Sequence, residues 1–395
     1  MINKEDSRYP YSFIILYAAV YMLLTIYSTF IPVYLDGIGF SKSIIGVLLA
    51  IGTLISIITQ PVWGIACDRS SNMNALLMAM FLGSAISMIL YPLSTGFVFI
   101  VIMTSAYAAF QSSIIPVSDA MVLEYMENKR WKYGPVRIAG SMGYAVMSIL
   151  AGIMARQNIN VIFPLYFCIS MIAFISVFRL PKIRGHQSKG RKTSVLGVFK
   201  SRRLVILLAF HFVIQITFGF YYSFFPIHYV QLGADSGILG MSFLIASLSE
   251  LPFLFFADRI IKRFGINKVL ISSALIISIR WMLTGIITDI NMMLLVSAAH
   301  GWSFIVFAYC MATFINKNVP KELKASGQAI NALLCIGLAR MIGSSIGGVI
   351  SDVTGFSQVF RLNSLICFIA ALTFGLYFAI TRIYGVKHGE TKHLN

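Results

Sequence analysis

The chain has 395 residues, of which 58% are hydrophobic and 11% are charged, and its formal net charge at pH 7 is +17. A water-soluble domain of this length needs more polar residues to cover its surface, so the composition excludes a soluble globular protein and indicates a membrane protein. The basic balance would also fit a nucleic-acid-binding protein, and the distribution of the charges along the chain decides between these classes.

Runs of about 20 apolar residues, the length of a helix that crosses a bilayer core, recur from one end of the chain to the other. The first run lacks a small-residue cleavage pattern, so we expect it to be a retained helix rather than a removable signal peptide. The sequence therefore predicts an all-α membrane protein with twelve transmembrane helices in two six-helix repeat bundles. The predicted spans are 11–33, 42–66, 75–94, 97–126, 136–155, 160–180, 204–231, 237–257, 269–288, 292–316, 326–350 and 359–381.

The positive charge is concentrated in every second connection between these spans. The segment 181–203 holds eight Lys and Arg residues and no acid, whereas the alternate loops carry little charge. Because basic residues mark the cytoplasmic side of a membrane protein, we expect a multi-pass protein of the cytoplasmic membrane with both termini in the cytoplasm. The charge is thus a signal of topology, and the expected surroundings are the lipid bilayer rather than nucleic acid.

The two halves of the chain repeat each other. "YSTFIPVYLDGIGFSKSIIGVLLA" (27–50) aligns with "YSFFPIHYVQLGADSGILGMSFLI" (222–245), and "QPVWGIACDR" (60–69) aligns with "ELPFLFFADR" (250–259). We therefore predict an N-terminal bundle at 1–180, a basic cytoplasmic linker at 181–203 and a C-terminal bundle at 204–395. Parallel repeats of six spans are typical of transporters that bind their substrate near the membrane midplane between the repeats.

A short motif carries a resemblance to a known superfamily. Gly64, Asp68 and Arg69 match the G-x-x-x-D-R core of the motif between helices 2 and 3 of the major facilitator superfamily, and Asp258 and Arg259 belong to its second copy. The resemblance implies a gating motif, in which the glycine permits close helix contact and Asp68 caps a helix N-terminus. The chain departs from the full motif, because "SSNMN" replaces its later basic residues.

A few ionisable residues lie inside the predicted spans, where a charge costs about 2.5–3.5 kcal/mol on insertion scales. Glu250, Arg280, His300 and Arg340 occupy helices 8 to 11, and in the first half Asp119 precedes Arg137 by 18 positions. They line a substrate site, or they form structural pairs that cancel the cost of insertion. Three simpler readings are that Arg137 snorkels to the surface, that His300 is a satisfied core histidine and that Arg340 makes an interface contact.

The spacing of these residues resembles lactose permease and the related oligosaccharide:proton, nucleoside and phenylpropionate permeases. By this resemblance Asp119 and Arg137 fall on a sugar-binding carboxylate and arginine, Glu250 lies near the helix 8 glutamate, and Arg280 and His300 keep a separation of 20 residues. The resemblance implies that five residues bind substrate: Asp119, Arg137, Glu250, Arg280 and His300. The buried charge adds Arg340 to this predicted set. The repeat adds the symmetry-related Tyr27 and Tyr222, whose rings offer stacking faces to a substrate or serve only in packing and at the membrane interface.

The chain also departs from this family. Ser297 and Ser303 stand where the permease has a lysine and its proton-coupling glutamate, and helix 7 has no aspartate. The proton relay therefore cannot be transferred unchanged, and we expect Glu250 first and Asp119 second as proton-coupling residues. A carboxyl group in an apolar cavity changes its affinity for protons when a guanidinium approaches it, as symport requires.

These observations predict a secondary transporter that carries a saccharide or a nucleoside by proton symport and alternating access. Uptake of an aromatic carboxylate is the alternative, because three arginines outnumber two carboxylates in the predicted site and leave one positive charge for an anion. Efflux stays open, and a non-transporting membrane sensor is a further class. The sequence contains no H-E-x-x-H or cofactor fingerprint, so we expect neither an enzyme nor a metal or cofactor. The expected partners are a small-molecule substrate and protons, and the family resemblance implies a monomer.

Overall fold

The structure is a computed structural model that describes residues 11–126, 134–183, 202–319 and 324–387. Within them lie twelve helical segments that are long and apolar enough to cross a membrane, so the predicted all-α architecture is confirmed. Several bounds differ from the predicted ones, most of all for the eighth span. The observed spans are Tyr11–Gly37, Lys42–Cys67, Met73–Leu93, Phe97–Met126, Pro135–Ala155, Ile159–Phe178, Arg202–Gln231, Ser236–Phe264, Ile266–Ile286, Ile290–Asn318, Gly327–Thr354 and Phe356–Thr381.

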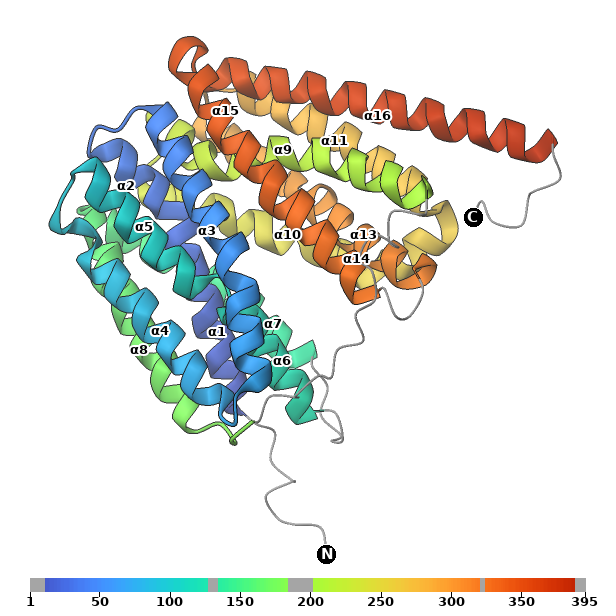
Figure 1. Cartoon of the computed structure of the whole chain (residues 1–395). Helices are drawn as coiled ribbons and strands as arrows, with labels where there is room; N and C mark the ends of the chain where they lie inside the picture. The colour runs from blue at the N-terminus through green and yellow to red at the C-terminus, as the bar shows by residue number, and fades with distance from the viewer. Residues whose placement is uncertain (1–10, 127–133, 184–201, 320–323, 388–395) are drawn as a thin grey trace, which may run out of the picture. The chain divides into compact units, whose positions relative to one another are not determined.

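The helices group into two compact units. Unit 1 comprises 1–40, 47–190 and 234–244, and unit 2 comprises 41–46, 191–233 and 245–395. The first residues of the second and eighth spans are thus grouped with the other unit. In unit 1, α1 packs against α7 and α8, while α4 packs against α5 and α8 (Figure 1). Its helices are α1 (Tyr11–Thr25), η2 (Ile26–Phe30), α2 (Ile31–Gly37), α3 (Lys42–Arg69), α4 (Met73–Leu90), η3 (Tyr91–Leu93), α5 (Phe97–Gln111), α6 (Ile114–Met126), α7 (Gly134–Ala155), η4 (Ile159–Val161) and α8 (Ile162–Phe178).

Unit 2 is built around α9, the most deeply buried span. In Figure 1, α15 and α16 run beside α9, and α16 also packs along α11. Its helices are α9 (Arg202–Gln231), α10 (Ser236–Phe264), α11 (Ile266–Ile286), α12 (Ile290–Ala298), η6 (Ala299–Trp302), α13 (Phe304–Asn318), α14 (Lys324–Asn331), η8 (Ala332–Leu338), α15 (Ala339–Thr354) and α16 (Phe356–Lys387).

Local sequence explains where these helices turn and break. Gly265 and Gly355 have φ of +80°, a conformation that side-chain-bearing residues rarely adopt, and each closes a tight turn between two spans. The side chain of Asp289 caps α12 by accepting the backbone N–H of Met292 at 2.8 Å. In the tenth span the helix is interrupted by the 3₁₀ turn η6, and in the eleventh by the π-helix η8. Such irregular turns are frequent at functional sites.

Two glycines that the repeat aligns with each other are points of close backbone approach. A Cβ on Gly46 would lie 2.3 Å from the carbonyl oxygen of Ser344 in unit 2, and a Cβ on Gly240 would lie 1.9 Å from that of Ser148 in unit 1. Neither position has room for a side chain. The repeat therefore preserves a packing requirement as well as a sequence pattern.

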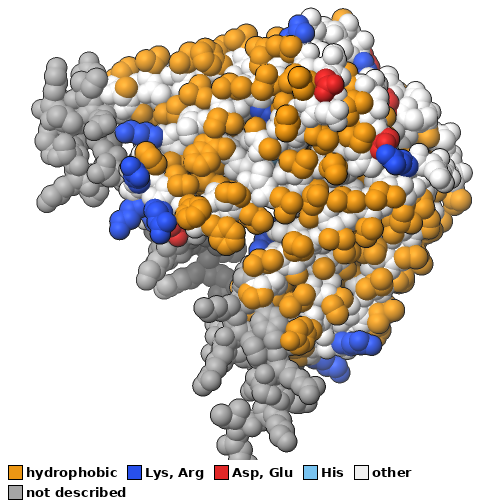
Figure 2. Space-filling model, turned by 180° about the vertical axis from the view of Figure 1, so that it is seen from behind, with side chains coloured by type: hydrophobic (Ala, Val, Ile, Leu, Met, Phe, Trp, Pro, Cys, Tyr) orange, Lys and Arg blue, Asp and Glu red, His pale blue; other side chains and the backbone are white. Residues whose placement is uncertain are grey.

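The surface of the molecule is apolar over much of its area. Figure 2 shows hydrophobic side chains spread over the visible face, with Lys and Arg near its margins. Phe255 is 78% exposed and Leu295 is 76% exposed. Exposed apolar area of this extent fits a surface that faces lipid hydrocarbon rather than water.

Candidate functional site

Glu250, His300 and Arg280 form one contiguous group in unit 2. His300 lies between the other two, with Nε2 3.4 Å from Glu250 Oε1 and Nδ1 2.8 Å from Arg280 Nη1. Arg280 is 1% exposed and His300 is 5% exposed. The histidine therefore connects the carboxylate to the guanidinium.

The position of His300 depends on the break in the tenth span. His300 sits on η6, and Gly301 beside it packs directly on α10, where its Cβ would lie 1.8 Å from the carbonyl oxygen of Ser249. Because Ser249 precedes Glu250, this contact holds η6 next to the carboxylate. A regular helix with a larger residue at 301 could not come so close.

The hydrogen bonds of His300 fix the proton on its ring. A guanidinium can only donate, so Arg280 Nη1 donates to His300 Nδ1, and Nδ1 must carry a lone pair. The ring proton of the neutral imidazole is then on Nε2, which lies 3.4 Å from both Glu250 Oε1 and the hydroxyl of Tyr222. A carboxylate, a neutral histidine and a guanidinium thus lie in contact in that order, with the histidine in the middle.

Arg280 is enclosed by aromatic rings and hydroxyl groups. Its Nη2 donates to the hydroxyl of Tyr221 at 2.7 Å, its Nη1 lies 3.5 Å from Ser303 Oγ, and its guanidinium carbon lies 4.9 Å from the centre of the Trp281 ring. Its Nε is buried and has no hydrogen-bond partner among the described residues. A buried donor left unpaired costs about 1–3 kcal/mol, so this nitrogen favours an added acceptor.

Arg340 occupies a similar environment on α15. Its Nε donates to Gln215 Oε1 at 2.9 Å, and its guanidinium carbon lies 4.8 Å from the centre of the Tyr222 ring and 5.3 Å from that of Phe304. Within the described part of the chain its Nη2 is buried without a hydrogen-bond partner. Cation–π contacts hold the guanidinium plane, while the free nitrogen remains able to bind an acceptor.

Small residues bring α9 and α15 close enough for these contacts. A Cβ on Gly219 would lie 2.4 Å from the carbonyl oxygen of Arg340, and one on Gly343 would lie 1.9 Å from that of Ile216. The two backbones therefore touch next to the Gln215–Arg340 hydrogen bond. Arg340 thus contacts α9 at a helix interface, while its Nη2 stays buried without a hydrogen-bond partner among the described residues.

Asp119 and Arg137 lie in unit 1 and share a neighbour. Tyr17 donates its hydroxyl to Asp119 Oδ1. Arg137 is exposed, and its guanidinium carbon lies 4.6 Å from the centre of the Tyr21 ring. Tyr21 interacts electrostatically with both Asp119 and Arg137. The structure thus brings the two predicted residues to one tyrosine, Tyr21.

The two symmetry-related tyrosines have different surroundings. Tyr222 contacts Arg340 and His300, so it belongs to the polar group of unit 2. Tyr27 lies in the π-helix η2 and stacks on Tyr107, with ring centres 3.9 Å apart. The sequence repeat is therefore retained in the helices, while the chemistry around the two rings has diverged.

The structure describes the surroundings of most of the predicted gating residues. No atom of the described residues lies within 4 Å of a Cβ placed on Gly64, so the close helix contact expected there is not seen among them and stays a prediction. Arg69 is exposed at the end of α3, and the side chain of Asp68 lies outside the described residues. In the second copy, Asp258 accepts the hydroxyl of Tyr309 at 2.8 Å, and the guanidinium of Arg259 lies 5.7 Å from the Phe256 ring centre.

Gln215 is a residue of this polar group that the sequence argument missed. A glutamine within the apolar stretch "HFVIQITF" of α9 was the available signal, although it is weaker than that of a charge, because burying a neutral amide costs less than burying an ion. Its neighbour His211 carried the same signal. Gly301 was not identifiable, because its role follows from the distance to another helix.

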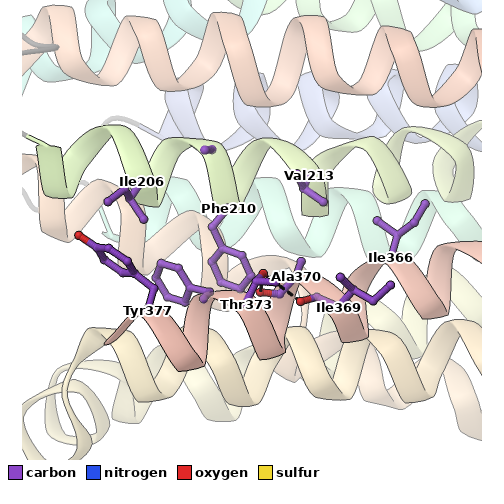
Figure 3. Close-up of a pocket in the computed structure, with 10 residues that line it drawn as sticks. Ile206, Phe210, Val213, Ile366, Ile369, Ala370, Thr373 and Tyr377 are labelled. Carbon is purple, nitrogen blue, oxygen red and sulfur yellow. Dashed lines mark hydrogen bonds between the residues drawn. The ribbon is translucent and has the colours of Figure 1, made fainter. Parts of the chain in front are cut away.

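A separate cavity of about 510 Å³ lies between α9 and α16 on another side of α9 (Figure 3). Its lining is apolar except for Thr373 and Tyr377, and none of the predicted site residues borders it. It is lined by Ile206, Ala209, Phe210, Val213, Ile366, Ile369, Ala370, Thr373, Phe374 and Tyr377. A cavity of this composition cannot serve the polar group described above.

Replacing Gly301 with alanine is expected to destabilise the protein by about 1–3 kcal/mol, because the added methyl group overlaps the carbonyl of Ser249. Thermal unfolding of the purified protein in detergent measures this. Gly375→Ala is the matched control, since its Cβ would meet its nearest neighbour, on Ile271, at an ordinary 3.8 Å. Equal unfolding temperatures for the two variants would contradict the proposed packing.

Comparison with known proteins agrees with the fold. A family model described as the MFS_1 like family matches residues 11–362. The chain belongs to this family. It is therefore a multi-pass membrane transporter of the major facilitator superfamily and not an enzyme, and the predicted family resemblance is confirmed.

The names of relatives of this MFS transporter refer to different small molecules. The maltose permease of Geobacillus stearothermophilus is 25% identical over 358 residues, which cover 90% of this chain and 89% of the permease. The probable 3-phenylpropionic acid transporter of Escherichia coli strain K12 is 21% identical over 348 residues, which cover 86% of this chain and 91% of that protein. The crystal structure of the nucleoside transporter NupG has a TM-score of 0.83 with 15% identity, and the match covers 93% of this chain and 98% of NupG.

Proposed function

We propose that this MFS transporter carries a saccharide or a nucleoside across the cytoplasmic membrane together with a proton, by alternating access. The observation that carries the proposal is the pair of guanidinium groups in unit 2, each with one buried nitrogen that has no partner among the described residues. Hydroxyl and carbonyl oxygens of a polar solute are acceptors for such donors. The aromatic rings of Tyr221 and Tyr222 add flat apolar faces beside the guanidinium groups, which suits a sugar ring or a base.

The proton-coupling role belongs to Glu250 in this proposal. As a carboxylate, Glu250 accepts from the Nε2–H of His300, which in turn accepts from Arg280. When Glu250 takes a proton it becomes neutral, and the charge of Arg280 loses its nearest compensation. Binding of a proton at Glu250 thus changes how strongly Arg280 attracts an acceptor on the solute, which links the two binding events. Asp119, bonded to Tyr17, is the second candidate for proton coupling.

The same proposal assigns Asp119, Arg137 and Tyr27 to substrate binding from unit 1. Both chain termini face the cytoplasm in this proposal, and the protein works as a monomer. The basic segments that support this orientation lie partly outside the described residues, at 127–133 and 184–201.

An aromatic carboxylate is the second candidate substrate, and one observation favours it. The partners of Arg340 among the described residues are neutral, namely Gln215, Tyr222 and Phe304. A substrate carboxylate would bind the free guanidinium nitrogen with a charge-assisted hydrogen bond. One relative is named as a probable 3-phenylpropionic acid transporter.

Transport by the purified protein in proteoliposomes tests the proposal. With an imposed pH gradient, we expect accumulation of either radiolabelled maltose or uridine, accompanied by proton entry that an enclosed pH-sensitive dye records. Accumulation of 3-phenylpropionate alone would favour the second candidate. If none of the three probes accumulates, and if collapse of the gradient changes nothing, the proposed symport is wrong.

A further inference from the structure

Two polar side chains of α9, His211 and Gln215, connect Arg340 to the α14 helix through a continuous chain of hydrogen bonds. His211 Nδ1 lies 2.8 Å from Asn331 Oδ1, and His211 Nε2 lies 2.9 Å from Gln215 Nε2. Gln215 Oε1 then accepts from Arg340 Nε at 2.9 Å. His211 is 1% exposed and Gln215 is fully buried, so water does not compete for these bonds.

The donors and acceptors in this chain have only one consistent assignment. Arg340 Nε can only donate, so the atom of Gln215 that faces it must be the amide oxygen. The amide nitrogen of Gln215 therefore faces His211 and donates to its Nε2, which must carry a lone pair. The proton of the imidazole is then on Nδ1 and is donated to Asn331 Oδ1. His211 is neutral in this arrangement.

The groups around His211 provide no carboxylate among the described contacts. The ring of Phe307 on α13 stacks on it with centres 5.5 Å apart, and α14 supplies the amide of Asn331. From η8 the thiol of Cys335 donates to the carbonyl of Leu208, one turn before His211. The charged group that acts on His211 is Arg340 on α15. A proton on His211 would thus be added near an existing positive charge.

We propose that Gln215 and His211 are positioning residues for Arg340, and that neutral His211 is what fixes the Gln215 amide in the orientation that holds the guanidinium. This inference rests on the proposed function, in which Arg340 binds the transported solute. It extends that function by giving the site a second proton-sensitive element, separate from the group of Glu250 and His300.

A proton on His211 reverses the chain of hydrogen bonds. Its Nε2 would become a donor and would face the amide nitrogen of Gln215, so two donors would oppose each other. Rotation of the amide relieves this conflict, but it turns the amide nitrogen toward Arg340 Nε, which is also a donor. The bond that holds Arg340 is therefore lost, and solute affinity falls at pH values where His211 takes up a proton.

Nitrogen NMR of the full-length protein with labelled histidine tests the assignment without any solute. The chain has six histidines, and loss of one signal in His211→Asn identifies the relevant one. We expect a neutral ring with the proton on Nδ1. In Gln215→Glu, the carboxylate still accepts from Arg340 but cannot donate to His211, so the ring should move to the form with a proton on Nε2. A wild-type ring that is protonated on Nε2 overturns the proposal.

Binding of maltose, uridine and 3-phenylpropionate to protein in nanodiscs gives the second readout. For whichever probe binds, Gln215→Met should lower the affinity about tenfold and remove part of its pH dependence. Gln328→Met is the matched control, because this α14 amide contacts Ala312 and Asn316 rather than the chain described here. Equal loss in both variants contradicts the positioning role. If the NMR assignment holds and no probe binds, the proposed substrates fail while the hydrogen-bond assignment stands.

Discussion

Replacing Glu250 with glutamine is expected to reduce proton-driven accumulation of the solute at least tenfold, equivalent to about 1.4 kcal/mol of lost coupling. The amide has nearly the same shape but cannot take up and release a proton, so binding and exchange of solute should continue. Accumulation in proteoliposomes under a pH gradient, compared with exchange of labelled for unlabelled solute without a gradient, separates these activities.

Two further variants of the same group sharpen this experiment. Glu250→Asp keeps the ionisable group but shortens the side chain and lengthens its 3.4 Å contact with His300, so we expect partial coupling. His300→Gln removes the ring between Glu250 and Arg280 and should weaken coupling and binding together. Unchanged accumulation by Glu250→Gln would remove this carboxylate from the mechanism, and Asp119 would become the first candidate.

Replacing Arg340 with alanine is expected to weaken solute binding by about 10- to 150-fold. A hydrogen bond to a charged group contributes about 1.5–3 kcal/mol, and truncation also removes the cation from between Tyr222 and Phe304. Titration of the purified protein with maltose, uridine or 3-phenylpropionate by calorimetry measures the change in Kd. The loss should be largest for the carboxylate if the anion is the true substrate.

A lysine at position 340 is the matched comparison for this experiment. It keeps the positive charge but lacks the planar fork that binds Gln215 through Nε and presents Nη2 to a solute. We therefore expect Arg340→Lys to recover little of the affinity for a neutral solute. Full recovery by lysine would show that only the charge matters, and the proposed geometry would be wrong.

His211 and His300, both in unit 2, carry their ring protons on opposite nitrogens. Arg280 donates to His300 Nδ1, so the proton of His300 is on Nε2 and faces a carboxylate. Gln215 donates to His211 Nε2, so the proton of His211 is on Nδ1 and faces an amide. The neighbours of each ring, rather than the histidine itself, determine where its proton lies.

Apolar length was sufficient to predict the twelve-helix architecture. A bilayer core requires about 20 apolar residues for each helix, so the twelve spans were visible in a single sequence. The cost of burying a charge also made Glu250, Arg280, His300 and Arg340 conspicuous, and the structure brings them into one unit. The sequence repeat identified Gly46 and Gly240 as equivalent, although it gave no reason for their conservation between the halves.

Only the tertiary structure decided which of these residues touch and through which atoms. The sequence could not show that η6 and Gly301 carry His300 to Glu250, because that contact depends on the backbone distance between two helices. Nor could it show that Gln215 holds Arg340, since a neutral amide on another helix costs too little to be conspicuous beside the charges. Periodicity and burial cost act along the chain and are readable from it, whereas hydrogen-bond direction and close backbone approach exist only between segments that folding has brought together.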